Sequence, residues 1–309
     1  MSSQSELRQQ ITNQIIDALK SEKLPPWRKP WSAHRNAGLP TNVVSMNRYS
    51  GINPLLLQMS AERHRLRSKY WATFNQWKGM KGKVKPRPSH LQPGEWGTSI
   101  VFYKPIIKSQ IDPNTGEEEE TRFGVLKTYT VFNIDQVEGA HLDHLRVNDT
   151  AIEGGFIDYD PAERAIQKTH ADIRYGGNQA FYKSFNPDGD GDYIQLPLRH
   201  HFKSRSDFYA TALHELMHWS EDRLSWKGNY AEGELRAEIG ACFAMTELGV
   251  PHSEDMTNHH SYVKSWLKRL ESDPKFIFTA STAASRAADF VLSFSQEPEV
   301  VPFPAAMVV

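Results

Sequence analysis

Apolar positions along this chain follow a helical period in some segments and a strand period in others. Residues 5–20 repeat isoleucine and leucine three or four positions apart, which places them on one helix face, and Ser5 can cap the first turn. A second helix is expected from Asn53, because asparagine caps helix starts and Pro54 suits a first turn. The chain is therefore expected to open with helices.

A β-rich stretch follows these helices. Residues 70–74, 98–103 and 127–132 are dominated by aromatic and β-branched side chains, which favour strands. Turn residues at 112–116 separate the last two of these segments. A hairpin is therefore predicted in this part of the chain.

The second half is mainly helical by the same criteria. Two short strands are predicted at 181–182 and 193–197, around a turn of aspartates and glycines. Helices are predicted at residues 161–171, 206–219, 232–248, 259–270 and 281–294, with Ser206 as the cap of the second.

A polar, weakly patterned stretch near residues 136–152 indicates a domain boundary. We therefore predict an α+β protein with two domains, a mixed α/β domain over 1–140 and a second domain over 150–295. The last residues, 296–309, include three prolines and are expected to form a flexible tail.

Composition and charge divide the 309 residues in a similar way. Residues 1–110 carry 18 Lys and Arg against five Asp and Glu, a net of +13, whereas residues 111–309 carry 18 against 32, a net of −14. One half can therefore attract a polyanion that the other half repels.

A single cysteine excludes a disulfide framework, and neither an apolar signal segment nor a membrane-length apolar run is visible, so a cytoplasmic protein without a membrane partner is expected.

The predicted helix over 206–219 contains His214 and His218 with Glu215 between them. Positions i and i+4 lie on one helix face, so both imidazoles can bind one ion, while Glu215 can act as the catalytic base on a water. Two nitrogens, one carboxylate and an open position suit Zn²⁺, and another divalent ion such as Mn²⁺ is the alternative. A pair of hydrogen-bonded core histidines is the competing interpretation of the same pattern.

The next predicted helix offers Glu234 and Glu238, again at i and i+4. Glu238 follows His218 by twenty residues, and this spacing resembles the gluzincin pattern, in which a glutamate on the following helix is the third ligand. Glu238 is therefore predicted as the ligand, and Glu234 as the partner of an imidazole N–H, with an exchange of these roles as the alternative.

The basic half also holds five of the eight tryptophans, interleaved with cations. Aromatic rings that stack on bases and cations that follow phosphates are the combination by which proteins bind single-stranded nucleic acid, although about half of these tryptophans are expected in the core. The predicted DNA contacts are Trp27, Arg28, Lys29, Trp31, Arg48, Tyr49, Trp71, Trp77, Lys78, Lys81 and Lys83.

Several motifs resemble those of the ArdC-type antirestriction family. Residues 24–31 read Leu-Pro-Pro-Trp-Arg-Lys-Pro-Trp, which is similar to the beginning of the family's N-terminal domain, a domain shared with TraC-like plasmid primases. The remaining similar segments are 40–42, 48–53, 71–76 and 131–136 in the first half, and 192–197, 214–218 and 230–238 in the second. The chain departs from the pattern at residues 85–88, where a glycine-containing basic turn is expected.

The resemblance implies a conjugative-plasmid protein that binds single-stranded DNA and protects it from host restriction. It also implies a zincin-like metallopeptidase domain, in which the strand at 193–197 would be the edge strand that pairs with substrate. Two alternatives remain: a DNA-binding shield with a structural or inactive metal site, and a peptidase that cleaves a regulatory protein. The sequence does not identify a host protein substrate.

Overall fold

The computed structural model describes residues 4–21, 25–28, 36, 38–111, 118–147, 159–185, 191–252 and 260–295. Up to residue 147 the elements are α1 (Gln4–Ser21), η1 (Pro26–Arg28), β1 (Thr41–Asn42), α2 (Asn53–His64), β2 (Tyr70–Thr73), α3 (Phe74–Gly79), β3 (Lys83–Val84), β4 (Thr98–Ile111), β5 (Glu118–Asn133), η2 (Ile134–Gln136), β6 (Val137–Glu138) and η3 (Ala140–Leu145). From residue 159 they are α4 (Asp160–Lys168), β7 (Ile173–Tyr175), β8 (Phe181–Lys183), β9 (Tyr193–Leu196), η4 (Arg199–His201), α5 (Arg205–Arg223), α6 (Tyr230–Glu247), α7 (His260–Ser272) and α8 (Phe276–Ser293).

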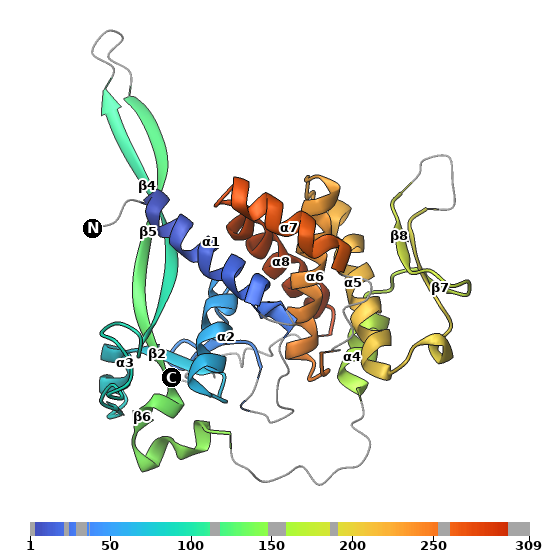
Figure 1. Ribbon diagram of the computed structural model, residues 1–309. Coiled ribbons are helices and arrows are strands. Elements are labelled where there is room, and N and C mark those ends of the chain that lie inside the picture. The colour runs from blue at the N-terminus through green and yellow to red at the C-terminus, as the bar shows by residue number, and fades with distance from the viewer. Residues whose placement is uncertain are drawn as a thin grey trace, which may run out of the picture.

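The predicted α+β class is confirmed, and each predicted strand and helix that falls on described residues is present. The turn at 112–116 and the tail at 296–309 lie outside the described residues. The strands predicted at 98–103 and 127–132 are longer than expected, because β4 and β5 form one twisted ribbon whose outer end stands away from the helices (Figure 1).

The first-half sheet has the order β1-β2-β5-β4, with β1 parallel to β2 and the other pairs antiparallel. Strand β4 is thus an edge strand, and Asn53 occupies part of its free edge. The Asn53 side chain donates to Val101 O and accepts from Val101 N, both at 2.8 Å. The expectation that Asn53 caps α2 is therefore wrong: Ile52 is the N-cap residue, and the Asn53 amide fixes α2 to β4 instead.

Hydroxyl side chains cap two other helices, α3, which the sequence analysis did not predict, and α5, whose predicted start moves by a few residues. Strand β2 ends at Thr73, whose hydroxyl accepts from Gln76 N in a capping box that begins α3 at Phe74. The cap of α5 is Ser204, whose Oγ accepts from Asp207 N at 3.1 Å, and not Ser206 as expected. In each case the hydroxyl satisfies a backbone N–H that the first helical turn leaves without a partner.

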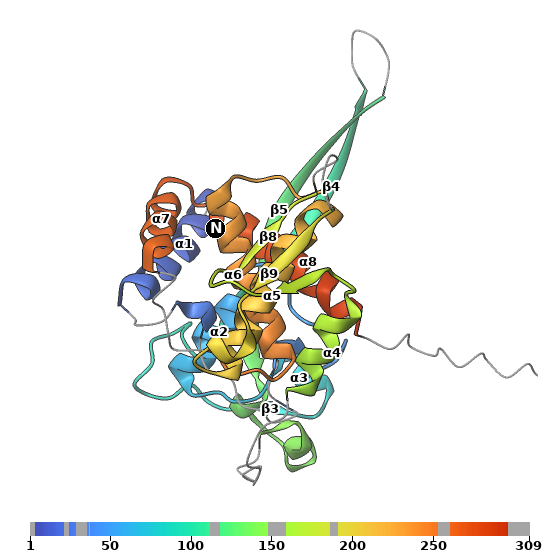
Figure 2. The same ribbon diagram turned by 90° about the vertical axis from the view of Figure 1, so that its right-hand side faces the viewer.

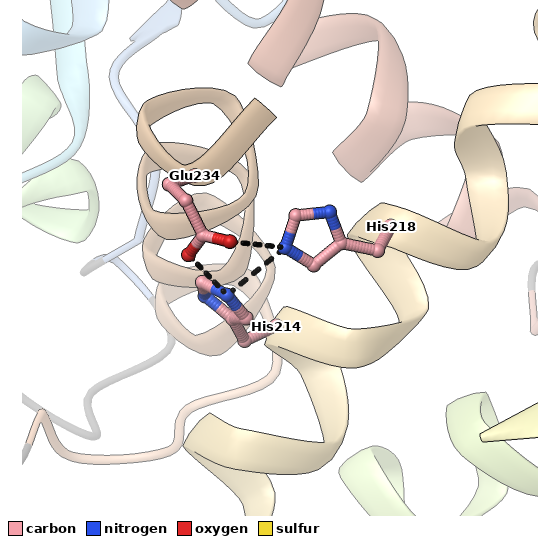
Figure 3. Close-up of side chains that lie close together, drawn as sticks. All are labelled: His214, His218 and Glu234. Atoms are coloured by element: carbon pink, nitrogen blue, oxygen red, sulfur yellow. Dashed lines mark hydrogen bonds and ion pairs between the residues drawn. The ribbon is translucent and has the colours of Figure 1, made fainter. Parts of the chain in front are cut away.

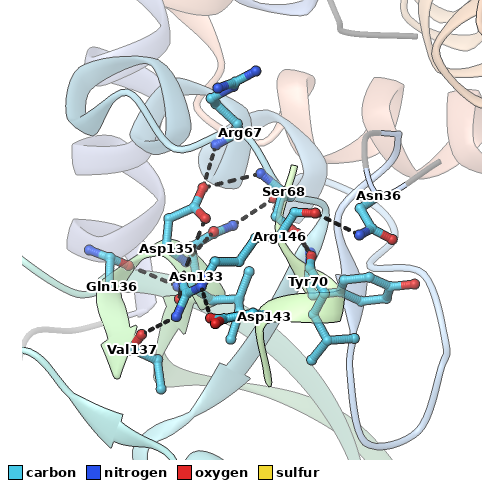
Figure 4. A network of polar contacts seen from close by, with 12 residues as sticks. Asn36, Arg67, Ser68, Tyr70, Asn133, Asp135, Gln136, Val137, Asp143 and Arg146 are labelled. Carbon is cyan, nitrogen blue, oxygen red and sulfur yellow. Dashed lines mark hydrogen bonds and ion pairs between the residues drawn. The ribbon is translucent and has the colours of Figure 1, made fainter. Parts of the chain in front are cut away.

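A polar network holds the end of β5 against the loop that precedes β2 (Figure 4). Asp135 accepts from Arg67 N at 2.7 Å and lies 3.7 Å from the Arg146 guanidinium. Arg146 also donates to Ile134 O at 2.6 Å and Val137 O at 2.5 Å. The chain around this sheet end is thereby fixed by side chains rather than by strand pairing.

The second-half sheet is small, and its order is β7-β9-β8. Strand β9 is parallel to β7 and antiparallel to β8, so it lies in the centre. The expectation that the strand at 193–197 is an edge strand is therefore wrong. The edge strands are β7 and β8, and β8 is the one that borders the cleft described below.

The main hydrophobic core joins the two halves of the sequence. It contains side chains of α1 and α2 together with side chains of α6, α7 and α8. Trp27 packs edge-to-face on Trp266, with 5.9 Å between ring centroids, and Thr12 donates to Pro274 O at 2.9 Å. Figures 1 and 2 both show α1 beside α7. The two predicted domains thus share a core, and their bounds at 140 and 150 stay a prediction.

Candidate metal centre and nucleic-acid surface

Helices α5 and α6 bring the predicted site residues together. His214 and His218 lie one turn apart on α5, with ring centroids 4.9 Å apart, and α6 places Glu234 opposite them (Figure 3). The helices approach closely because Gly240 faces Met217: a Cβ atom at this glycine would lie 2.8 Å from the Met217 sulfur. This close contact sets which residues of α6 face the imidazoles.

Three donor groups, two imidazoles and one carboxylate, converge at this contact. His214 Nε2 and His218 Nε2 are 3.2 Å apart, and the Glu234 carboxylate oxygens lie 3.5 and 3.6 Å from them respectively. Tetrahedral ligands at about 2.0 Å from a zinc ion are spaced by about 3.3 Å. The three groups are therefore spaced as the donors of one metal ion, and these residues form a candidate metal site.

The geometry favours the alternative in which the two glutamates exchange their predicted roles. Glu238 Oε2 lies 3.9 Å from His214 Nδ1, on the side of the ring that faces away from the three converging atoms. The exposed fraction of the Glu238 side chain is only 2%. Glu238 is therefore placed as the carboxylate behind His214, and Glu234 faces the candidate metal position.

His218 has a carboxylate partner that the sequence reasoning missed. Glu221 Oε1 lies 2.9 Å from His218 Nδ1, within hydrogen-bond distance, whereas the Glu238 carboxylate is beyond that distance, 3.9 Å from His214 Nδ1. Arg236, which is fully buried, lies 3.7 Å from the same oxygen and donates to Met217 O at 2.7 Å. The sequence feature that indicates a contact between Glu221 and His218 is their i+3 spacing, which places both side chains on one helix face.

The electrostatics of the site fit a proton acceptor beside a cation site. Burial raises the pKa of Glu215, and the charges of His214 and His218 only partly oppose this effect. Burial also tends to raise the pKa of Glu234, but its hydrogen bond to His214 and the two imidazole charges outweigh burial, so the pKa is lowered. Glu215 is thereby the better base, and Glu234 the better permanent anion.

A cleft of about 880 Å³ opens above these residues and is bordered by β8. Five carboxylates line it, namely Glu215, Glu221, Asp222, Glu234 and Glu238. Among the residues described, no lysine or arginine lines the cleft. A cleft of this charge suits a metal ion and a peptide, and it repels a phosphate backbone.

The predicted stacking tryptophans are mostly core residues. Trp27, Trp71 and Trp77 are exposed by 1%, 1% and 0%, and the Trp77 indole donates to Phe132 O at 2.9 Å. Their rings are not accessible to bases, which corrects the expectation for these three. The sheet and the core need large apolar anchors, and the tryptophan pattern alone does not separate such anchors from surface rings.

The predicted polar contacts to DNA divide into three groups. Arg48 lies 3.5 Å from Glu247 and 3.2 Å from Asp289, so its ion pairs join the two halves of the chain. Tyr49 is half-buried, and its hydroxyl accepts a hydrogen bond from the Asn42 amide. Lys78, Lys81 and Lys83 are exposed, as a phosphate-binding role requires. Lys29 and Trp31 lie outside the described residues, and Arg28 is described only as part of η1.

Comparisons with known proteins agree with the zincin-like arrangement of α5 and α6. Residues 160–283 match the family described as zincin-like metallopeptidase, and residues 5–132 match the N-terminal domain of anti-restriction factor ArdC. The crystal structure of the antirestriction protein ArdC from plasmid R388 in its metal-free form matches with a TM-score of 0.71 and 34% identity, over 94% of this chain and 98% of that one. Its Mn(II)-bound structure matches with a TM-score of 0.67 and 32% identity.

Curated relatives extend this result. Protein y4eC of Sinorhizobium fredii is 30% identical over 93% of this chain and 92% of its own length. DNA primase TraC of Escherichia coli is 32% identical over 94% of this chain, but the chain spans only 27% of that protein. The chain belongs to the ArdC antirestriction family, and its zincin-like domain implies a divalent metal ion. Within the described residues, no helix is long and apolar enough to cross a membrane.

Proposed function

We propose that this protein protects incoming conjugative DNA from host restriction, and that it combines single-stranded DNA binding with a metal-dependent peptidase activity. The observation that carries the peptidase part is the convergence of His214, His218 and Glu234 beside a retained Glu215. The expected cytoplasmic location stays a prediction.

The ligands would be the Nε2 atoms of both histidines and the Glu234 carboxylate, whose spacing of 3.2 to 3.6 Å supports this role. Zn²⁺ is the expected ion and Mn²⁺ the alternative. When bound, such an ion acidifies a water molecule and polarises a peptide carbonyl. Glu221 and Glu238 would orient the two imidazoles from behind and keep each Nε2 directed at the ion.

Glu215 would take the proton of the attacking water and pass it to the departing amine. Its position next to a ligand and its raised pKa support this role, because a carboxylate in an apolar setting is a stronger base. Tyr230 lies at the cleft with its hydroxyl 2.8 Å from that of Tyr262, and it is a candidate donor to the developing oxyanion.

An extended substrate would pair with the free edge of β8, which replaces the originally expected strand at 193–197. Strand β8 borders the cleft and has β9 on one side only, so its other edge offers backbone groups to a peptide. The Glu215 carboxylate accepts from the backbone of Tyr182 in β8, which places the base beside this edge.

Single-stranded DNA would bind to the first half of the chain. The net charge of +13 over residues 1–110 supports this division, and so does the acidic lining of the cleft in the other half. Exposed Lys78, Lys81 and Lys83 would contribute phosphate contacts.

A second candidate function is a DNA-binding shield in which the metal-site half is only structural. The shared core favours this alternative, because α6, α7 and α8 pack against α1 and α2 whether or not catalysis occurs. In this case a metal ion would stabilise the packing of α5 on α6 without taking part in a reaction.

Glu215→Gln separates the two functions. The variant should keep metal and DNA binding, because Glu215 is not among the three converging ligands, and it should cleave an unfolded test protein such as casein about 10²–10⁴-fold more slowly. If the variant also loses protection of incoming DNA in a restricting recipient strain, peptidase activity is required for antirestriction. Undiminished protection would instead support the shield. Wild-type protein loaded with metal that cleaves no test protein would contradict the peptidase proposal.

A further inference from the structure

The ribbon of β4 and β5 presents aromatic and basic side chains on a common face. The two strands pair residue for residue, with Phe102 opposite Lys127. In an antiparallel pair, opposed residues point to the same face, and every second residue along a strand shares it. Phe102, Lys104, Lys127 and Tyr129 therefore lie on one face, and all four are exposed. We call these four residues the ribbon face.

At its base, the same side of the ribbon is covered by α2. Ile100 and Val131 are buried in a cluster with Leu57 of α2. The hydroxyls of Ser60 and Thr98 are hydrogen-bonded at 2.5 Å, which fixes α2 over this end of the ribbon. The ribbon face begins where this cover ends.

The opposite side of the ribbon is used to attach it to the body. Val101 belongs to the main core, and Leu126 packs against the same core. The attachment leaves the ribbon face exposed, and the outer part of the ribbon stands clear of the helices in both views (Figures 1 and 2). The position of the face is therefore set by the packing of its reverse side.

The two rings of the ribbon face are unusually accessible for aromatic side chains. Phe102 is 56% exposed and Tyr129 is 45% exposed, and their ring centroids lie 6.3 Å apart at an interplanar angle of 82°. Exposed neighbouring aromatic rings on a folded surface usually indicate an interaction site. Lys104 and Lys127 stand beside these rings on the same face.

We propose that the ribbon face is the stacking platform for single-stranded nucleic acid. Unpaired bases would stack on Phe102 and Tyr129, and the phosphates would contact Lys104 and Lys127. This inference rests on the proposed DNA-binding function and assigns its place in the fold. It assigns base stacking to Phe102 and Tyr129 in place of the buried tryptophans. The pattern of tryptophans in the sequence did not indicate these two rings.

The decisive experiment measures binding of a fluorescently labelled oligothymidylate to the full-length chain by anisotropy. Phe102→Ala and Tyr129→Ala test stacking, and Phe102→Tyr should restore it. The matched control is Tyr103→Ala, because Tyr103 is 59% exposed on the same strand but points to the opposite face. Lys104→Gln and Lys127→Gln test the phosphate contacts, with Lys227→Gln in the acidic half as the matched charge control.

Each of the two alanine variants should bind about 5-fold to 100-fold more weakly, and the Tyr103→Ala control should bind as wild type does. Each lysine variant should lower the slope of log affinity against log salt by about 0.7, and the Lys227→Gln control should leave it unchanged. Unaltered metal content and helicity confirm that the variants are folded. An oligonucleotide that contains 5-iodouracil should cross-link on irradiation to peptides from β4 and β5.

Two failures are distinguishable. Wild-type protein that does not bind the oligonucleotide would overturn single-strand binding together with the ribbon face. Wild-type binding that survives Phe102→Ala and Tyr129→Ala, or that falls equally in the Tyr103→Ala control, would overturn the ribbon face alone. Cross-links confined to peptides outside β4 and β5 would do the same.

Discussion

The proposed exchange of roles between Glu234 and Glu238 gives a sharp test of the metal site. Glu234→Ala removes the carboxylate whose oxygens lie 3.5 and 3.6 Å from the two Nε2 atoms. Glu238→Ala removes a carboxylate 3.9 Å from His214 Nδ1, to which we assign the role of orienting the ring. Loss of such an orienting partner costs about 10–100-fold in metal affinity. Loss of one of three protein ligands should therefore cost more than about 100-fold.

The assay is a competition between the full-length protein and a chromophoric chelator for Zn²⁺, repeated with Mn²⁺. Glu221→Ala should behave like Glu238→Ala, because Glu221 stands behind His218 at 2.9 Å. Glu232→Ala is the matched control, since Glu232 lies on the same helix but serves in the capping box of α6. Circular dichroism separates a lost ligand from a lost fold.

Equal losses for Glu234→Ala and Glu238→Ala would contradict the assigned roles, and a larger loss for Glu238→Ala would reverse them. A Glu234→Ala variant that retains wild-type affinity would refute the candidate site as a whole. In that case the two histidines would be hydrogen-bonded to each other and to their carboxylates without a metal ion.

Two further predictions concern stability. Trp77→Ala should lower the free energy of unfolding by about 3–5 kcal/mol in chemical denaturation, because the ring is fully buried, but it should leave the DNA affinity of the folded protein unchanged. Weakened DNA binding without lost stability would argue that Trp77 contacts DNA. Asp192→Asn should cost about 1 kcal/mol at pH 7, since the ion pair with Arg223 holds the pKa of Asp192 below its ordinary value. A lowered folded-state pKa gives stability that is present above the unfolded-state pKa, near 4, and is lost as the pH falls further. The difference in the free energy of unfolding between variant and wild type should therefore vanish in acid. A difference that persists in acid would exclude the ion pair as its cause.

The helical and strand periods of the sequence predicted the main helices and strands. They also predicted that His214 and His218 lie on one face of a helix. Both depend on local geometry: neighbouring side chains on one face of a helix are fixed by the helix itself, whatever packs against it. The same argument placed Glu234 and Glu238 on one face of the next helix. The HExxH pattern of α5 and the charge division therefore indicated a zincin-like half and a basic half before any packing was known.

Other features depend on contacts between segments that are distant in the sequence. Glu234 and Glu238 differ by one helical turn, about 5.4 Å, and the packing of α6 on α5 at Gly240 and Met217 decides which one faces the imidazoles. The same holds for aromatic rings, because composition cannot separate a core tryptophan from a surface ring. The core that joins α1 with α7 covers Trp27, whereas the attachment of the ribbon by its reverse face leaves Phe102 exposed. Burial is a property of the assembled surfaces, and only the tertiary structure determines it.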